Sequence, residues 1–140
     1  MLHPPNVLVV DDTEDIREMV SIALSTEGYS VTEAADGALA RAALLAGIAF
    51  DVIVLDLLMP IMDGAHFLEW KCGSAFADLP VVIFSSTTPS VRLEGYAGVV
   101  EVVAKLDGLT VLLASIVVAL TGLGGIGHLS YARKLRIEPN

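Results

Sequence analysis

The chain has 140 residues, of which 54% are hydrophobic, and this suits one domain with a sizeable core and argues against disorder. The net charge of -9 argues against nucleic acid as a direct partner, because binding to phosphates needs a basic surface. A single cysteine excludes an intramolecular disulfide, and the N-terminus lacks the pattern of a secretory signal, so we expect a cytoplasmic protein.

The first half of the chain alternates strand patterns with helix patterns. Residues 6–10 predict a buried strand that ends at Asp11 and Asp12, and residues 29–34 predict a more polar strand near a sheet edge. One helix should lie between these strands, and a second should begin at Asp36. The apolar face of the first helix should consist of Ile16, Met19, Val20, Ala23 and Leu24. That of the second should consist of Leu39, Ala42, Ala43 and Ala46.

The alternation continues after residue 50. Residues 52–55 predict a fully apolar strand that stops near Asp56, because Pro60 cannot continue a strand ladder. Asp63 should cap a third helix. The inward face of this helix should consist of Ala65, Leu68 and Cys72.

Two further strands complete the pattern. Residues 81–84 lead to Ser85, and residues 99–104 lead to Lys105, with a short helix expected to begin near Pro89. The β-α unit therefore occurs five times along the chain. Repeated units of this length predict an α/β fold, a doubly wound parallel sheet with helices on both faces.

Charged and hydroxyl side chains follow four of the predicted strands: Asp11, Asp12, Asp56, Ser85 and Lys105. The carboxyl ends of parallel strands share one edge of the sheet, so these side chains should converge. Three carboxylates at one place repel each other, and a divalent cation with hard oxygen ligands, such as Mg²⁺, removes that conflict. The cation and Lys105 would neutralise a phosphoryl group on Asp56, which Ser85 would hydrogen-bond.

These elements, in this order and spacing, resemble the CheY-like receiver domain of two-component response regulators over roughly residues 6 to 120. The elements that carry the resemblance are Asp11-Asp12, Asp56, Met59-Pro60, Asp63-Gly64, Ser85 and Lys105. The resemblance implies a flavodoxin-like (βα)5 sheet in the strand order 2-1-3-4-5. It also implies a single-domain regulator, with residues 1–121 as the receiver domain.

By the same resemblance, Asp56 would accept a phosphoryl group from a sensor histidine kinase or a histidine phosphotransfer protein. The chain would signal by contact with a downstream protein, and it would be a phosphoacceptor rather than an enzyme. Mg²⁺ would be bound by Asp12, Asp56 and the backbone carbonyl of Leu58, with Asp11 assisting through water. Ser85 and Lys105 would bind the phosphoryl oxygens and report their presence.

Three features depart from the family pattern. Leu106 stands where the family usually has a proline with a cis peptide, and a non-proline cis bond costs about 3 kcal/mol, so we expect a trans bond. Val102 occupies the position of the family's aromatic switch. The segment between Ser85 and Lys105 is short and contains two glycines, so the fourth helix should be short. Together these features suggest an atypical output surface.

The stretch from residue 108 to 127 carries no charge. Its helical part, Leu109 to Thr121, has 13 residues and would span about 20 Å, too little for a bilayer core of about 30 Å. Because this helix is apolar nearly all round, we expect a homodimer or partner interface there. Residues 122–140 should form a glycine-rich hinge and a short basic tail. Residues 122–127 match G-x-G-x-x-G, but they follow a helix, which favours a hinge over a dinucleotide site.

Two other functions stay open. A degenerate receiver that serves as a docking or dimerisation module is favoured by Leu106 and Val102 but opposed by the intact acids. A Mg²⁺-dependent phosphatase with an aspartyl-phosphate intermediate would share the chemistry of Asp56. Haloacid-dehalogenase-like enzymes of that kind want D-x-D after the first strand, and this chain does not supply it there.

Overall fold

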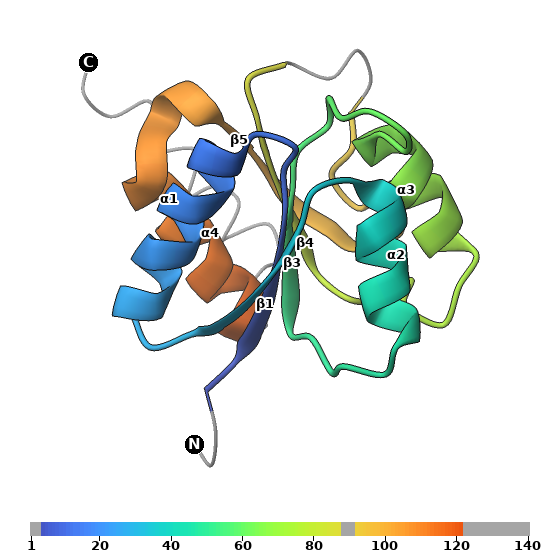
Figure 1. The fold of residues 1–140 in the computed structure, drawn as a ribbon, viewed down its shortest axis with the longest axis horizontal. Helices are drawn as coiled ribbons and strands as arrows, with labels where there is room; N and C mark the ends of the chain where they lie inside the picture. The colour runs from blue at the N-terminus through green and yellow to red at the C-terminus, as the bar shows by residue number, and fades with distance from the viewer. Residues whose placement is uncertain (1–3, 88–91, 122–140) are drawn as a thin grey trace.

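The computed structural model describes residues 4–87 and 92–121, and these residues form a five-stranded parallel sheet between two layers of helices (Figure 1). The strands are β1 (Asn6–Val10), β2 (Ser30–Ala34), β3 (Val52–Leu55), β4 (Val81–Ser85) and β5 (Val99–Ala104). Their order across the sheet is β2-β1-β3-β4-β5. The predicted α/β fold and the strand order 2-1-3-4-5 are therefore confirmed.

In the described part of the chain, helices cover both faces of the sheet (Figure 1). The helices α1 (Glu14–Thr26) and α4 (Gly108–Thr121) lie on one face, and α2 (Gly37–Leu45) and α3 (Gly64–Cys72) lie on the other. Successive strand residues point to opposite faces, so one core forms on each side. The first core includes Val9, Val54, Val82, Leu24 and Ile116, and the second includes Leu8, Ile53, Ile83, Leu44 and Phe67.

The register of the strands places the polar strand ends at one level. Val10 lies opposite Leu55 and Leu55 lies opposite Ile83, while Ser85 at the end of β4 pairs with Ala104 at the end of β5. The residue that follows each strand therefore emerges at the carboxyl edge of the sheet. β3 and β4 are buried along their whole length, and β1 is buried except for Asn6. This burial packs the three strands between apolar layers and fixes the position of the carboxyl edge.

The inward faces predicted for α2 and α3 are wrong in part. In α3 the buried residues are Gly64, Phe67, Leu68 and Lys71, whereas Ala65 and Cys72 are exposed. In α2 the buried residues are Gly37, Ala40 and Leu44, whereas Leu39 is 53% exposed. Each helix has a glycine where a neighbouring loop comes too close for a side chain: a Cβ on Gly37 would lie 2.6 Å from the Met62 carbonyl oxygen. A hydropathy pattern does not register such a steric contact, so it cannot predict which face of the helix is buried. The face predicted for α1 is correct except for Met19, which is 42% exposed.

Several other predictions concern the C-terminal half. The predicted start of a helix near Pro89, and the hinge and basic tail at residues 122–140, lie outside the described residues. In residues 92–98, the regular structure is a single 3-10 turn, η1 (Tyr96–Gly98). The last helix begins at Gly108, one residue before its predicted start. Within residues 4–87 and 92–121, no helix is long and apolar enough to cross a membrane.

Lys71 is a fully buried lysine at the end of α3. Its Nζ donates a hydrogen bond of 2.9 Å to the carbonyl oxygen of Ala77 and a second bond to that of Ala97. The lysine thereby ties α3 to the η1 turn that precedes β5. Burial lowers the pKa of Lys71 to about 8, although the charge of Asp78 acts in the opposite direction.

This pKa predicts an unusual dependence of stability on pH. The unfolded chain binds the Lys71 proton up to its ordinary pKa of 10.5, whereas the folded chain releases it near 8, so the free energy of unfolding should rise between these values. Relative to Lys71→Met, the wild type should gain about 2 kcal/mol between neutral pH and about pH 10. Chemical denaturation of both proteins at each pH measures this difference, and parallel pH profiles would contradict it.

Candidate functional site

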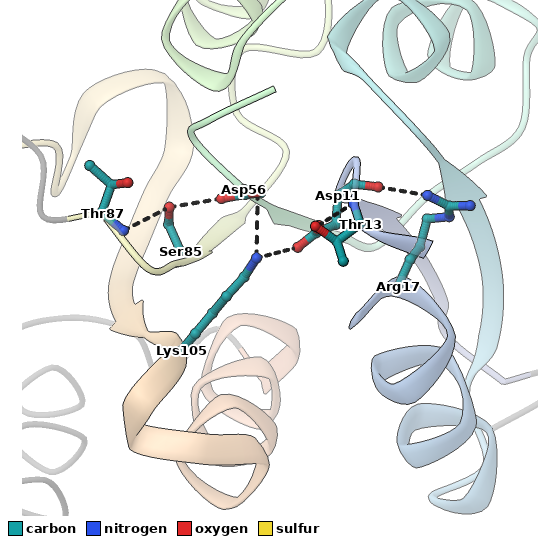
Figure 2. Close-up of polar contacts among 7 residues, drawn as sticks. All are labelled: Asp11, Thr13, Arg17, Asp56, Ser85, Thr87 and Lys105. Carbon is teal, nitrogen blue, oxygen red and sulfur yellow. Dashed lines mark hydrogen bonds and ion pairs between the residues drawn. The ribbon is translucent and has the colours of Figure 1, made fainter. Parts of the chain in front are cut away.

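The side chains predicted to converge do meet at the carboxyl edge of the sheet (Figure 2). One carboxylate oxygen from each of Asp11, Asp12 and Asp56 lies within 4.8 Å of the others. Asp11 and Asp12 follow β1, and Asp56 follows β3, so strand pairing alone brings residues 45 positions apart into contact. Asp11 and Asp56 are buried, and Asp12 is exposed at the mouth of the cluster.

Lys105 brings a positive charge into this group of acids. Its Nζ lies 2.8 Å from Oδ2 of Asp11 and 3.5 Å from Oδ2 of Asp56, and Figure 2 shows the side chain reaching from the end of β5 to both. The peptide bond between Lys105 and Leu106 is trans, as predicted. The lysine therefore reaches the acids without the cis bond that is usual in the family.

Ser85 lies on the other side of Asp56, at the end of β4 (Figure 2). Its hydroxyl donates a buried hydrogen bond of 2.8 Å to Oδ1 of Asp56 and accepts a bond of 3.3 Å from the amide of Thr87. Asp56 thus has one carboxylate oxygen held by a neutral hydroxyl and the other facing Lys105. This fixes the orientation of the Asp56 carboxylate relative to the mouth of the site.

The charge balance of the cluster depends on burial. Burial raises the pKa of Asp11 above its ordinary value and the charge of Asp56 adds to this effect, although hydrogen bonds from Lys105 and Thr13 oppose it. Burial also lowers the pKa of Lys105, but the hydrogen bond and charge of Asp11, with those of Asp56, outweigh it and raise that pKa. The ammonium group of Lys105 therefore lies between Asp11 and Asp56 and contributes positive charge to the acid cluster.

This donor set fits a small, hard cation. Carboxylate oxygens that converge on one point, with one of them open to solvent, are the ligands that Mg²⁺ prefers while it keeps several waters. The predicted backbone ligand, Leu58, lies two residues after Asp56 in the loop between β3 and α3. Leu58 is 61% exposed, and its role as a ligand stays a prediction.

The close approach of α3 shapes this loop. The amide of Gly64 donates a hydrogen bond of 2.9 Å to the carbonyl oxygen of Leu57, and Oδ1 of Asp63 caps α3 by accepting from the amide of His66 at 2.9 Å. The predicted cap at Asp63 is therefore confirmed. These contacts turn the chain back immediately after Asp56, which keeps the carboxylate at the end of the strand.

Arg17 on α1 also belongs to this region, although no motif in the sequence marks it. Its guanidinium Nη1 donates a hydrogen bond of 2.8 Å to the backbone carbonyl of Asp11 (Figure 2). Arg17 and Arg41 are the only bases in the first 70 residues, which also hold twelve acids. The sequence signal for Arg17 is that it is an isolated base among acids, five residues after Asp12.

Comparisons with known proteins agree with this arrangement. A model of the response regulator receiver domain family matches residues 7–116. The probable transcriptional regulatory protein TcrX of Mycobacterium tuberculosis is 43% identical over 84 residues, which cover 60% of this chain and 35% of that protein. This chain therefore spans only about a third of the length of that curated relative.

Solved structures show the same fold. The chemotaxis response regulator CheY4 of Vibrio cholerae superposes with a TM-score of 0.74 at 33% identity, covering 84% of this chain and 99% of that one. The response regulator TrrA of Thermotoga maritima, crystallised in complex with Mg²⁺-BeF, superposes with a TM-score of 0.73 at 25% identity, covering 83% and 99% of the two chains.

Proposed function

Because this chain belongs to the response regulator receiver domain family, we propose that it is a signalling module that accepts a phosphoryl group on Asp56 in the presence of Mg²⁺. The observation that supports this role best is the set of contacts around Asp56. The carboxylate is buried, Ser85 donates to one oxygen, and Lys105 faces the other.

In the proposed reaction, a carboxylate oxygen of Asp56 forms a bond to phosphorus. The bond between phosphorus and the donor's imidazole nitrogen breaks, and the histidine leaves with the electron pair. Lys105, 3.5 Å from Oδ2 of Asp56, would compensate charge on the phosphoryl oxygens, and the Ser85 hydroxyl that now donates to Asp56 would donate to one of them. The donor would be a sensor histidine kinase or a histidine phosphotransfer protein.

The acids would hold the cation. Asp12, Asp56 and the backbone carbonyl of Leu58 would be the Mg²⁺ ligands, with Asp11 acting through water. The convergence of the three acids supports a cation site here, and the related regulator TrrA was crystallised in complex with Mg²⁺-BeF. When bound, Mg²⁺ supplies positive charge that offsets the phosphoryl oxygens. Asp11 already has a partner in Lys105, which suits it to an indirect role.

Incubation of the protein with acetyl phosphate and Mg²⁺, followed by intact-mass measurement, tests the proposal. The mass should increase by one phosphoryl group, and the increase should vanish when a chelator removes Mg²⁺. A folded protein that gains no phosphoryl group with Mg²⁺ present would support the alternative of a degenerate docking module. Continuous release of phosphate from small phosphorylated metabolites would instead support the phosphatase alternative.

We also propose that α4 forms a homodimer interface, in line with its apolar sequence. The helix carries no charged residue, and its outer face includes Val117, which is 48% exposed. On α1, which packs beside α4, Met19 and Ile22 are 42% and 59% exposed. Together they give the α1–α4 side an exposed apolar surface.

Replacing Val117 with glutamate should therefore weaken self-association. We expect the dimer dissociation constant to rise about tenfold, because a charge would enter an apolar interface. Light scattering over a range of concentrations, with and without acetyl phosphate, measures this constant. Leu45→Glu is the matched control, because Leu45 is 65% exposed on α2 at the opposite face of the sheet. A wild type that stays monomeric throughout would contradict the proposal.

A further inference from the structure

Arg17 connects three segments around the acid cluster. From α1, its Nη1 donates to the Asp11 carbonyl at 2.8 Å, and its Nε donates to Oε1 of Glu33 on β2 at 2.9 Å. The Arg17 side chain is only 16% exposed. Its guanidinium therefore binds the strand end and the neighbouring strand at the same time, with two different nitrogens in a fixed plane.

The carbonyl that Arg17 holds belongs to the peptide bond between Asp11 and Asp12. The amide of Asp11 on the strand side donates to the Ala34 carbonyl at 3.1 Å, and the amide of Thr13 donates to Oδ1 of Asp11 at 2.9 Å. Arg17 adds the contact that fixes the plane of the peptide leading into Asp12. That peptide carries the nitrogen of Asp12, so its plane constrains the direction in which the Asp12 side chain leaves the backbone.

We propose that Arg17 is a positioning residue for the cation site, which it serves by holding the Asp11 carbonyl so that the Asp12 carboxylate faces Asp56. This inference rests on the proposed function, because the cation it concerns is the Mg²⁺ that phosphorylation would need. Asp12 is the exposed member of the three acids, so it depends on its backbone for orientation more than Asp11, which Lys105 and Thr13 already hold.

The charge of Arg17 would have the opposite effect on cation binding. A guanidinium near three carboxylates repels a divalent cation, so its removal would strengthen binding if charge alone mattered. If Arg17 acts by positioning, its removal weakens binding. The sign of the change therefore separates the two explanations.

Titration of the folded protein with MgCl₂ at constant ionic strength tests this inference, with the amide NMR shifts of Asp11, Asp12 and Asp56 as the readout. Arg17→Gln should weaken Mg²⁺ binding on the order of tenfold, as loss of an outer-shell partner of a metal site does. Arg41→Gln is the matched control. It removes the same charge from the same acidic half of the chain, but from α2 on the other face of the sheet, and should bind as the wild type does.

Three outcomes would overturn the inference, and they differ in meaning. Unchanged or tighter Mg²⁺ binding by Arg17→Gln overturns the positioning role and leaves the proposed function standing. Equal weakening in Arg41→Gln would show that the effect does not depend on the contacts that Arg17 makes, and so overturns the positioning role. A wild type without saturable shifts at the three aspartates removes both the proposed function and the role of Arg17.

Discussion

Asp56→Asn should gain no phosphoryl group from acetyl phosphate under conditions in which the wild type gains one. The asparagine has the same shape, and its amide oxygen can still accept the hydrogen bond that Ser85 donates at 2.8 Å, so the fold should be preserved. The amide lacks the anionic oxygen that must attack phosphorus. Intact-mass measurement of both proteins gives the result directly, and a phosphoryl group on the variant would contradict the assignment to Asp56.

The same variant should also lose its thermal response to Mg²⁺. A ligand that binds only the folded state stabilises it by RT ln(1 + [L]/Kd), which is about 1.4 kcal/mol at ten times the dissociation constant. The wild-type melting temperature should therefore rise with MgCl₂, and that of Asp56→Asn should not. Asp78→Asn, an exposed change outside the cluster, should respond as the wild type does.

The convergence of the site's side chains could be predicted because most of them follow a strong local signal. Asp11, Asp56 and Ser85 each end a continuous apolar run, and parallel pairing then leaves them little freedom in space. Lys105 follows a strand whose sequence alternates less clearly between apolar and polar residues. The β4–β5 register shifts between Val81 and Val82, and Ser85 then pairs with Ala104, so Lys105 emerges at the same edge. A strand end, once identified, largely determines where its side chain lies.

The helix faces were harder to predict because packing there depends on residues that carry no apolar signal. Lys71 is wholly buried because two carbonyl groups accept its hydrogen bonds, which no hydropathy pattern indicates. Cys72 was predicted to pack inward and is instead exposed. The contact of Arg17 with the Asp11 carbonyl could not be predicted either, because a single long side chain that reaches a backbone carbonyl produces no periodic pattern in the sequence.

Two of the expected departures from the family pattern, at Val102 and in the segment before β5, can be located in the structure. Val102 is half-buried and packs against the core on the side of α2 and α3, so the aromatic position of the family is filled by a smaller apolar residue. The described part of the segment before β5 is held to α3 by Lys71 and forms only the η1 turn. The acid cluster therefore keeps the residues of the family pattern, whereas Val102 and the segment before β5 depart from it, and an atypical output surface stays a prediction.

Gly64→Ala should produce the second large effect, because Gly64 presses against the backbone that carries Asp56. A Cβ at this position would lie 2.5 Å from the carbonyl oxygen of Asp56 and 2.8 Å from Cα of Leu57. Backbone atoms cannot move aside as a flexible side chain can, so α3 must shift or the strand end must bend. We expect a loss of about 2–3 kcal/mol in the free energy of unfolding, as for other overpacked sites, and slower phosphorylation of Asp56.

Gly73→Ala is the matched control at the other end of α3. Gly73 has φ of −95°, which any residue adopts, and the nearest atom to an added Cβ is the Trp70 carbonyl oxygen at 4.0 Å. This variant should stay within about 0.5 kcal/mol of the wild type and keep its phosphorylation rate. Urea denaturation and the rate of mass gain measure the two effects separately. Equal losses in both variants would show that α3 tolerates no side chain at either glycine, and that the contact with Asp56 is not the cause.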